Sequence, residues 1–496
     1  MKALSPTDSV FLWIETRSQP MHVAGLNLYT PPEGAGPDFV AGLMAKWREH
    51  TDALAPFNQR PMLKLGRWFW ETDNEFELDH HLRHLALPQP GRIRELLALV
   101  SQLHATLLDR NRPLWEIYVI EGLPGGRFAT YSKMHHALID GVSGAKMMAK
   151  ALAPAARLQK PPLWAQVLGK QPRPAESTAT ASLFNALADA ARIGGEILPG
   201  IKSGLLDLLR RGTGDSAAAR PFQAPPTPFN VSISGSRRFA AQSFSLARLK
   251  AIGKAGNATV NDVTLAICAG ALRRHLLAHA ALPKAPLIAM VPVSLHGEAG
   301  NGVEEGGNQV GILLANLATD VADPVARLQK IVQSTSAAKQ KLKRMSRLEK
   351  VAHAAALMAP AAPSVLSGDA RKRPLFNVVI SNVPGPQDLL YLNGARLDEV
   401  YPVSIPAHFL ALNITISGYG DKLGFGYIAC RRSVPAMQRL LDYTEQSIAE
   451  LEASLCPPDA RAARARKTPV QKSPARTSKA APTVSPHAAK LRKTPA

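Results

Sequence analysis

The chain has 496 residues, 46% hydrophobic and 20% charged, with a formal net charge of +21, a composition typical of a folded globular protein rather than a disordered or fibrous one. The chain is longer than one that ordinarily folds around a single hydrophobic core, so we expect two domains of roughly 200 residues each. The three cysteines, Cys268, Cys430 and Cys456, show no CxxC spacing, which argues against a disulfide framework or a structural zinc site.

The sequence predicts a cytoplasmic protein. Residues 1–16 contain one lysine and soon turn polar and acidic, unlike the apolar core and cleavage site of a signal peptide. The sequence has no run of about 18 uninterrupted apolar residues, so we expect no transmembrane helix. We therefore expect any membrane contact to be peripheral, at the inner membrane or on lipid inclusions.

Residues 1–155 are predicted to form a first domain of mixed helices and strands. Ser5 and Asp8 have the spacing of a capping box and Pro6 lies in the first turn, so a helix is expected there. Further along, the hydrophobic spacing predicts strands at 22–30, 114–123 and 127–136 and helices at 39–50 and 93–110, with a Pro-Gly-Gly turn between the last two strands.

Residues 156–235 are rich in proline and polar residues and are expected to connect two domains. Within them, residues 183–211 space Leu and Ile helically and end on arginines. This stretch is either a membrane-surface helix or a linker helix that packs on its own protein.

Residues 236–456 are predicted to form a second mixed domain. Strands are expected near 286–294, 375–383, 408–418 and 422–430, and helices at 261–280 and 434–454. Because these strands do not follow strict βαβ alternation, we predict two α+β halves rather than a doubly wound nucleotide-binding fold.

Residues 457–496 hold ten Lys or Arg and one acid, Asp459, so they supply +9 of the net charge and the rest of the chain +12. With almost no large apolar residue, this tail is expected to be disordered. Three roles of the tail remain open: a solvated segment with no partner, a segment that binds an anionic membrane or lipid-droplet surface, or one that binds nucleic acid.

The strongest chemical signal is the histidine pair in YSKMHHALIDG, residues 131–141. Neighbouring side chains of a strand point to opposite faces, so one of His135 and His136 is expected to act in a cleft and the other to support it. A neutral imidazole accepts a proton from an alcohol or thiol at neutral pH. Asp140 and Gly141 form a turn into a helix, and Asp140 is expected to stabilise it.

Two other interpretations of the pair remain open. The histidines with Asp140 could bind a metal, although strand-adjacent histidines diverge and no third ligand is obvious. They could also be hydrogen-bonded core residues. Elsewhere the chain has no GxGxxG, no Walker loop and no GxSxG elbow.

HHALIDG resembles the HHxxxDG motif of the CoA-dependent acyltransferase superfamily. Four further segments resemble bacterial wax ester synthase/diacylglycerol acyltransferases in the same order, and together the resemblance covers about residues 4–453. These segments are LSPTDSVFLWIET (4–16), RPLWEIYVIEGL (112–123), VNDVTLAICAGALRRHL (260–276) and FNVVISNVPGP (376–386).

The resemblance implies two chloramphenicol-acetyltransferase-like domains that face each other across a channel, with His136 at its centre. It implies that His136 acts as the general base and that Asp140 and Gly141 shape the turn. Asn261 is a candidate oxyanion donor, or a cap of a helix that begins at Asp262. Pro113, Leu114 and Trp115 are expected to be structural, and Ser381–Pro386 to form a tight turn that also borders the channel.

The implied activity is transfer of a fatty acyl group from acyl-CoA to diacylglycerol, to a long-chain alcohol, or to both. Acyl-CoA would be a co-substrate, and no cofactor or metal is expected. A non-catalytic lipid- or polyanion-binding protein on the same scaffold and a peptide-bond-forming condensation domain are the rival interpretations. An intact HHxxxDG motif argues against the first, and the lack of adenylation or carrier segments against the second.

Overall fold

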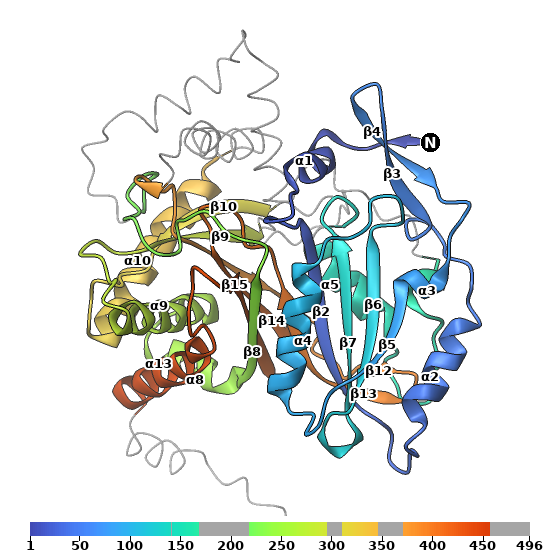
Figure 1. Cartoon of the computed structure of the whole chain (residues 1–496). Coiled ribbons are helices and arrows are strands. Elements are labelled where there is room, and N and C mark those ends of the chain that lie inside the picture. The colour runs from blue at the N-terminus through green and yellow to red at the C-terminus, as the bar shows by residue number, and fades with distance from the viewer. Residues whose placement is uncertain (140, 168–217, 295–309, 346–370, 457–496) are drawn as a thin grey trace, which may run out of the picture. The chain divides into compact units, whose positions relative to one another are not determined.

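Two six-stranded sheets with mixed strand directions form the centre of the structure (Figure 1). The computed structural model describes residues 1–139, 141–167, 218–294, 310–345 and 371–456. The expected α+β architecture is confirmed, since helices and strands mix in both halves. The stretch 183–211 and the tail 457–496 lie outside the described residues.

The first sheet has the order β12-β13-β2-β7-β6-β5, in which only β5 and β6 are parallel. The predicted strands at 22–30, 114–123 and 127–136 are confirmed as its centre. Its strands are β12 (Tyr391–Leu392), β13 (Ala395–Val403), β2 (His22–Thr30), β7 (Phe128–His135), β6 (Trp115–Glu121) and β5 (Leu82–Ala86).

The second sheet has the order β10-β9-β11-β14-β15-β8, and β11 runs parallel to both of its neighbours. All four strands predicted for this half are confirmed. Its strands are β10 (Val310–Asn316), β9 (Ile288–Ser294), β11 (Val378–Val383), β14 (Leu412–Tyr419), β15 (Lys422–Cys430) and β8 (Arg237–Ser245).

A small third sheet lies at the edge of the first half, with the order β1-β4-β3. Strands β3 and β4 form a hairpin, and the N-terminal strand pairs with β4. Its strands are β1 (Lys2–Ala3), β3 (Gln59–Lys64) and β4 (Arg67–Thr72).

Strand β13 crosses from the C-terminal part of the chain into the first sheet, where it pairs with β2. The two sheets are therefore not built from separate stretches of sequence, as the expected division into 1–155 and 236–456 implied. Residues 1–456 form one compact unit in which both sheets are included.

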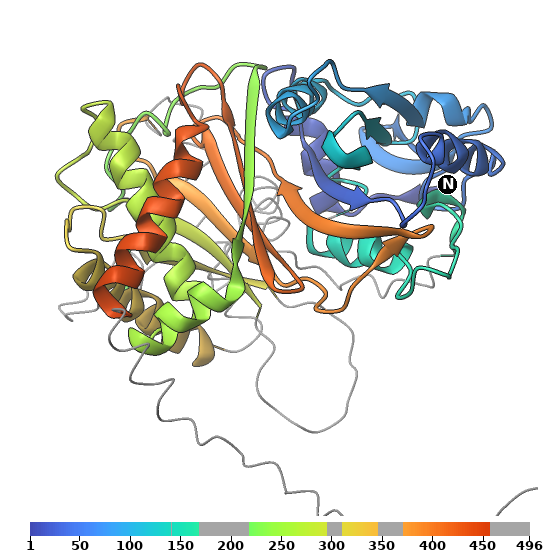
Figure 2. The ribbon, with the colours of Figure 1, turned by 90° about the horizontal axis from the view of Figure 1, so that it is seen from below.

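Helices flank both sheets. In the first half these are α1 (Pro6–Ile14), α2 (Phe39–Arg48), α3 (Leu78–His81), α4 (Ile93–Ala105) and α5 (Gly141–Ala151). In the second half α8 (Leu246–Ala255), α9 (Val260–Ala278), α10 (Pro324–Lys343) and α13 (Arg439–Leu455) gather on one face of the second sheet (Figure 2). Short 3₁₀ turns span Pro124–Gly126 and Leu163–Ala165. Among the described residues, no helix combines the length and apolar character needed to cross a bilayer.

Local capping explains where two helices begin. Ser5 caps α1 by accepting a hydrogen bond from the backbone N–H of Asp8, as predicted. Helix α9, however, begins at Val260, because Thr259 and Asp262 form a reciprocal capping box. The expectation that this helix begins at Asp262 with Asn261 as its cap is therefore wrong.

The buried apolar residues form separate clusters, each between particular helices and strands. The largest cluster lies between α9, α13 and the second sheet, and includes Leu272, Ile414 and Phe425. A further cluster joins α4 to strands of both sheets, with Val100 from α4 and Phe239 from β8 among its members. This shared layer holds the two sheets in one unit, so that they can form a site between them.

Candidate active site

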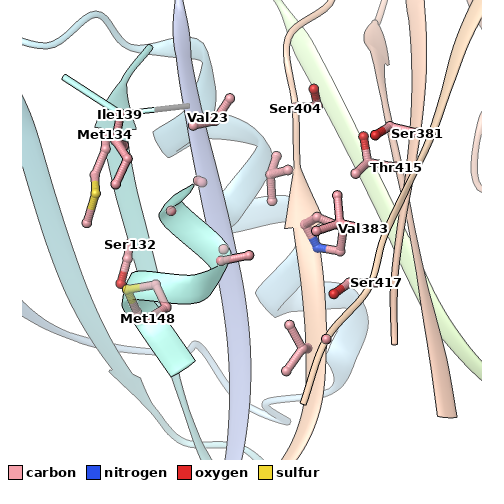
Figure 3. A pocket seen from close by; sticks show the side chains of 18 of the residues that line it. Val23, Ser132, Met134, Ile139, Met148, Ser381, Val383, Ser404, Thr415 and Ser417 are labelled. Carbon is pink, nitrogen blue, oxygen red and sulfur yellow. The ribbon is translucent and has the colours of Figure 1, made fainter. Parts of the chain in front are cut away.

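A cavity of about 520 Å³ lies between the two sheets (Figure 3). One wall comes from β2, β7 and α5 with α1 at its end, and the other from β9, β11 and β14, with β13 between them. Most of the lining is apolar. Side chains from the two walls include Val23, Met134, Ile139, Met148, Met290, Val379, Val383 and Leu410.

His136 brings an imidazole to this apolar cavity. It directly follows β7, and its backbone N–H donates a hydrogen bond of 2.8 Å to the carbonyl oxygen of Met21. Its ring stacks on that of Phe11, with centroids 4.1 Å apart and planes inclined by 20°. Phe11 belongs to α1, so the first helix of the chain fixes one face of the histidine.

His135 points away from the cavity and is fully buried. Its Nδ1 accepts a hydrogen bond of 3.0 Å from the backbone N–H of Ala137, so in the neutral ring the proton is on Nε2. Nε2 lies 3.4 Å from the Oε1 atom of Glu15, a close electrostatic contact that lacks the geometry of a hydrogen bond. The alternation expected for a strand thus separates the two imidazoles.

Glu15 is a buried acid at the centre of these contacts. Its Oε1 accepts a hydrogen bond from the backbone N–H of Met21 (2.8 Å), and its Oε2 accepts two from Arg110 (2.9 and 3.1 Å). Burial raises the pKa of Glu15, but the contacts with His135, Met21 and Arg110 outweigh burial and lower that pKa below its ordinary value. An ionised carboxylate therefore links the end of α1 to the residue before β2, to the end of β7 and to the segment between α4 and β6.

The sequence interpretation did not single out Glu15. One signal was available, because an acid directly after a helix is disfavoured by the partial negative charge of the helix C-terminus. Such a residue needs compensation elsewhere, which here comes from Arg110 and His135. Both partners lie about a hundred residues away in sequence, so no local pattern reveals them.

The other residues predicted for the site, Asp140, Gly141 and Asn261, are not among the described residues that line the cavity. Asp140 lies outside the described residues, and Gly141 is the first residue of α5. Asn261 lies in the first turn of α9. Within the described ranges, no group of three His, Cys, Asp or Glu residues could hold a metal ion.

The segment Ser381–Pro386 borders the cavity, as expected: Ser381, Val383 and the Pro-Gly-Pro turn after β11 all line it. Gly385 is required in this turn, because a Cβ atom there would collide with the carbonyl oxygen of Gly418 at the end of β14. Close backbone approach thus shapes this wall.

Leu114 and Trp115 are fully buried, which fits the structural role expected for their segment. The indole Nε1 of Trp115 donates to the carbonyl oxygen of Phe57 (2.7 Å), and the carbonyl oxygen of Leu114 accepts from the backbone N–H of His135 (3.0 Å). This segment therefore supports the end of β7 from the side opposite Met21.

A few polar groups interrupt the apolar lining. Ser132 and Met134 face the cavity together with His136, as alternate residues of one strand direction. The hydroxyl of Ser132 is buried and has no hydrogen-bond partner among the described residues. Across the cavity, Thr415 donates to the side-chain oxygen of Asn413 (2.9 Å). The cavity thus fits a long apolar ligand that carries few polar groups.

Two α+β halves with an apolar cavity between their sheets place the chain among proteins with the fold of condensation domains. The first condensation domain of the CDA synthetase shares this fold, with a TM-score of 0.52 at 14% identity, over 92% of this chain and 96% of that one.

The family is shown by closer comparisons. The model of the wax ester synthase/diacylglycerol acyltransferase catalytic domain matches residues 4–264, and that of the WS/DGAT C-terminal domain matches residues 306–452. The chain therefore belongs to the wax ester synthase/diacylglycerol acyltransferase family and is an O-acyltransferase.

Individual relatives match over nearly their whole length. The O-acyltransferase WSD of Acinetobacter baylyi is 44% identical, over 90% of this chain and 96% of the relative. A Mycobacterium bovis protein with a provisional name as a diacylglycerol O-acyltransferase is 45% identical, over 91% and 99%. The solved structure of the wax ester synthase/diacylglycerol acyltransferase from Marinobacter aquaeolei VT8 matches with a TM-score of 0.76 at 44% identity, over 92% of this chain and all of that one.

Proposed function

We propose that the protein transfers a fatty acyl group from acyl-CoA to the hydroxyl of diacylglycerol, of a long-chain alcohol, or of both. The observation that carries the proposal is the imidazole of His136 at an apolar cavity of about 520 Å³. Its lining suits acyl chains, and the names of relatives include a diacylglycerol O-acyltransferase and a wax ester synthase. No resident cofactor or metal enters the proposed reaction.

In the proposed reaction, a ring nitrogen of His136 accepts the proton of the acceptor hydroxyl as the oxygen attacks the thioester carbon. The tetrahedral intermediate then expels the CoA thiolate, which takes the proton from the imidazolium, so that an ester and free CoA are formed. A positioned general base contributes about 10² to 10⁴ in rate. Asn261 stays a proposed donor to the oxyanion, and Asp140 and Gly141 stay proposed to orient the base through the turn before α5.

The positions of the other groups support this assignment. Phe11 stacks on the His136 ring and the carbonyl of Met21 holds its backbone, so the imidazole has a fixed orientation. Glu15 and His135 hold the surrounding backbone through Met21 and Ala137. We assign these two residues a positioning role, because neither lines the cavity.

The test is transfer from labelled palmitoyl-CoA to hexadecanol or to dioleoylglycerol, with separation of the lipid products. His136→Ala is expected to lower kcat by about 10² to 10⁴. His275→Ala is the matched control, because His275 is also buried but belongs to α9 and does not line the cavity. The proposed activity would be overturned if neither acceptor gave an ester. An unchanged rate in His136→Ala would overturn the role of the base.

A further inference from the structure

The tip of the β3–β4 hairpin exposes apolar side chains that the proposed reaction does not use. Leu65 is fully exposed, Leu63 is 43% exposed, and Trp13 of the adjacent α1 is 56% exposed. The indole of Trp13 packs edge-on against Trp68 of β4, with ring centroids 5.6 Å apart. Figure 1 shows the hairpin beside α1, with the N-terminus at its edge.

These side chains share one face. Leu63 lies directly opposite Trp68 in the strand register, so both point to the side of the hairpin that meets α1 and Trp13. Leu65 lies two residues further on, in the turn of the hairpin. We call Trp13, Leu63 and Leu65 the hairpin patch.

The turn itself shows that Leu65 is not placed for stability. Lys64 pairs with Arg67, so the loop has two residues, and Leu65 and Gly66 both have positive φ, at 47° and 72°. Such a turn favours Asn-Gly or Asp-Gly, because a bulky side chain at positive φ is strained. A leucine here costs the hairpin stability and buries nothing in the described structure.

Basic side chains lie near the patch: Lys64 and Arg67 flank the two-residue turn and point to the face opposite Leu63, and Lys2 is on the neighbouring strand β1. Lys2, Lys64 and Arg67 are all exposed, and residues 59–72 hold three cations against one acid, Glu71. Glu71 pairs with Arg60 at 3.5 Å and with Lys64 at 3.8 Å, whereas the ion pairs of the described residues do not include Lys2 or Arg67. Exposed apolar side chains with a tryptophan and nearby cations suit the interface of an anionic lipid surface.

The patch is also connected to the catalytic histidine. Helix α1 presents Trp13 to the surface and Phe11 to the cavity, where the Phe11 ring stacks on His136. We propose that the hairpin patch docks the protein onto a phospholipid surface with anionic headgroups. Its purpose, access to lipid acceptors dissolved in that surface, rests on the proposed function.

The test measures sedimentation of the full-length protein with phosphatidylcholine vesicles, with and without phosphatidylglycerol. Leu65→Asn replaces an apolar side chain with a residue that favours this turn, so the melting temperature is expected to stay the same or to rise. Partitioning to the vesicles is expected to weaken about ten-fold, the effect of withdrawing one leucine side chain from an apolar phase. Phosphatidylglycerol is expected to strengthen binding of the wild type.

Leu277→Asn is the matched control, because Leu277 is 52% exposed on α9 in the other half. It is expected to bind vesicles like the wild type. The basic residues 457–496 are identical in all variants, so their contribution cancels. Equal binding by Leu65→Asn and wild type, equal weakening by both variants, or a wild-type dimer that dissociates in Leu65→Asn without any vesicle binding would each overturn the proposal.

His136→Ala separates docking from catalysis. It is expected to sediment with vesicles like the wild type although its transfer activity is lost. In contrast, Leu65→Asn is expected to retain transfer to a short, water-soluble alcohol and to lose transfer to dioleoylglycerol presented in vesicles. Failure of the vesicle measurements alone would therefore leave the proposed transfer reaction standing, and the reverse also holds.

Discussion

Adjacent histidines acquire opposite environments because they lie at the end of a strand. His136 turns its ring to the cavity, and His135 turns its ring to Glu15, which pairs with Arg110. The buried carboxylate is compensated by Arg110, so the pair is stable only while both are present. The protein thus supports one imidazole at the cavity with a second set of charged groups that do not line it.

Glu15→Gln is expected to lower both stability and activity. The amide keeps the size of the side chain, but its NH₂ group cannot accept from Arg110 while its oxygen accepts from Met21. A lost charged hydrogen bond at a buried site costs about 1.5 to 3 kcal/mol, measurable as a change in the free energy of unfolding. We also expect kcat to fall about ten-fold or more with little change in KM, since a 1 Å misplacement of the base is enough for such a loss.

The control for this prediction is Glu95→Gln. Glu95 forms a bidentate contact with Arg92 at the start of α4, and neither residue lines the cavity. Exposed ion pairs contribute little to stability. If both variants lost activity equally, the assignment of a positioning role to Glu15 would be wrong.

At the scale of elements, the wall of the cavity depends on how closely the turn after β11 approaches β14. These two strands are parallel neighbours, and Gly385 passes directly beside the carbonyl of Gly418. Residues of the same turn line the cavity. A change of backbone spacing here therefore changes the shape of the site without touching His136.

Gly385→Ala is expected to destabilise the protein by about 1 to 3 kcal/mol, the usual cost of overpacking. Because the turn must move away from Gly418, we also expect a changed preference among acyl-CoA chain lengths. Gly42→Ala is the control: a Cβ atom there meets nothing within 4 Å, and Gly42 lies inside α2. That substitution should stabilise the helix by up to about 1 kcal/mol. Unfolding midpoints in urea decide both expectations, and equal midpoints would contradict them.

At the scale of the whole unit, a shared layer joins the two sheets. The hydroxyl of Ser101 in α4 accepts a hydrogen bond of 2.8 Å from the backbone N–H of Phe239 in β8. His104 of the same helix donates from Nε2 to the carbonyl of Ser404, which follows β13, and accepts at Nδ1 from the hydroxyl of Tyr131. These bonds hold the neutral imidazole between the halves.

Burial lowers the pKa of His104 to about 3, against an ordinary value of 6.5. The unfolded chain therefore binds a proton between these values that the folded chain does not, so stability is complete above pH ~6.5 and falls as the pH drops below it. At pH 5 the loss from this group is expected to be about 2 kcal/mol.

Urea unfolding of wild type and His104→Gln at neutral pH and at pH 5 measures this effect. The variant is expected to be less stable at neutral pH and to lose less stability on acidification. An identical acid-induced loss in both proteins would show that other groups, such as the buried His22, dominate the pH dependence.

The predictable parts of this fold are those whose signals are local. The cap at Ser5, the strands that end at His135 and Cys430, and the helix that ends at Leu455 all follow from capping and from the period of the hydrophobic residues. The predicted start of the helix at Asp262 failed because Thr259 competes with Asn261 for the same role. Strand β13 and the β3–β4 hairpin were not predicted, since the alternation of apolar and polar residues is weak in these strands.

The sequence by itself determined the mixed architecture, the divergence of the two histidines and the segment that supplies the imidazole at the cavity, because each depends on residues within a few positions of one another. Only the tertiary structure decided that Glu15 and Arg110 lie behind His135, that the described cavity lining does not include Asn261, and that β13 completes the first sheet. These features join residues tens to hundreds of positions apart. Their energies depend on burial and on contact across the chain, which neither spacing nor composition records.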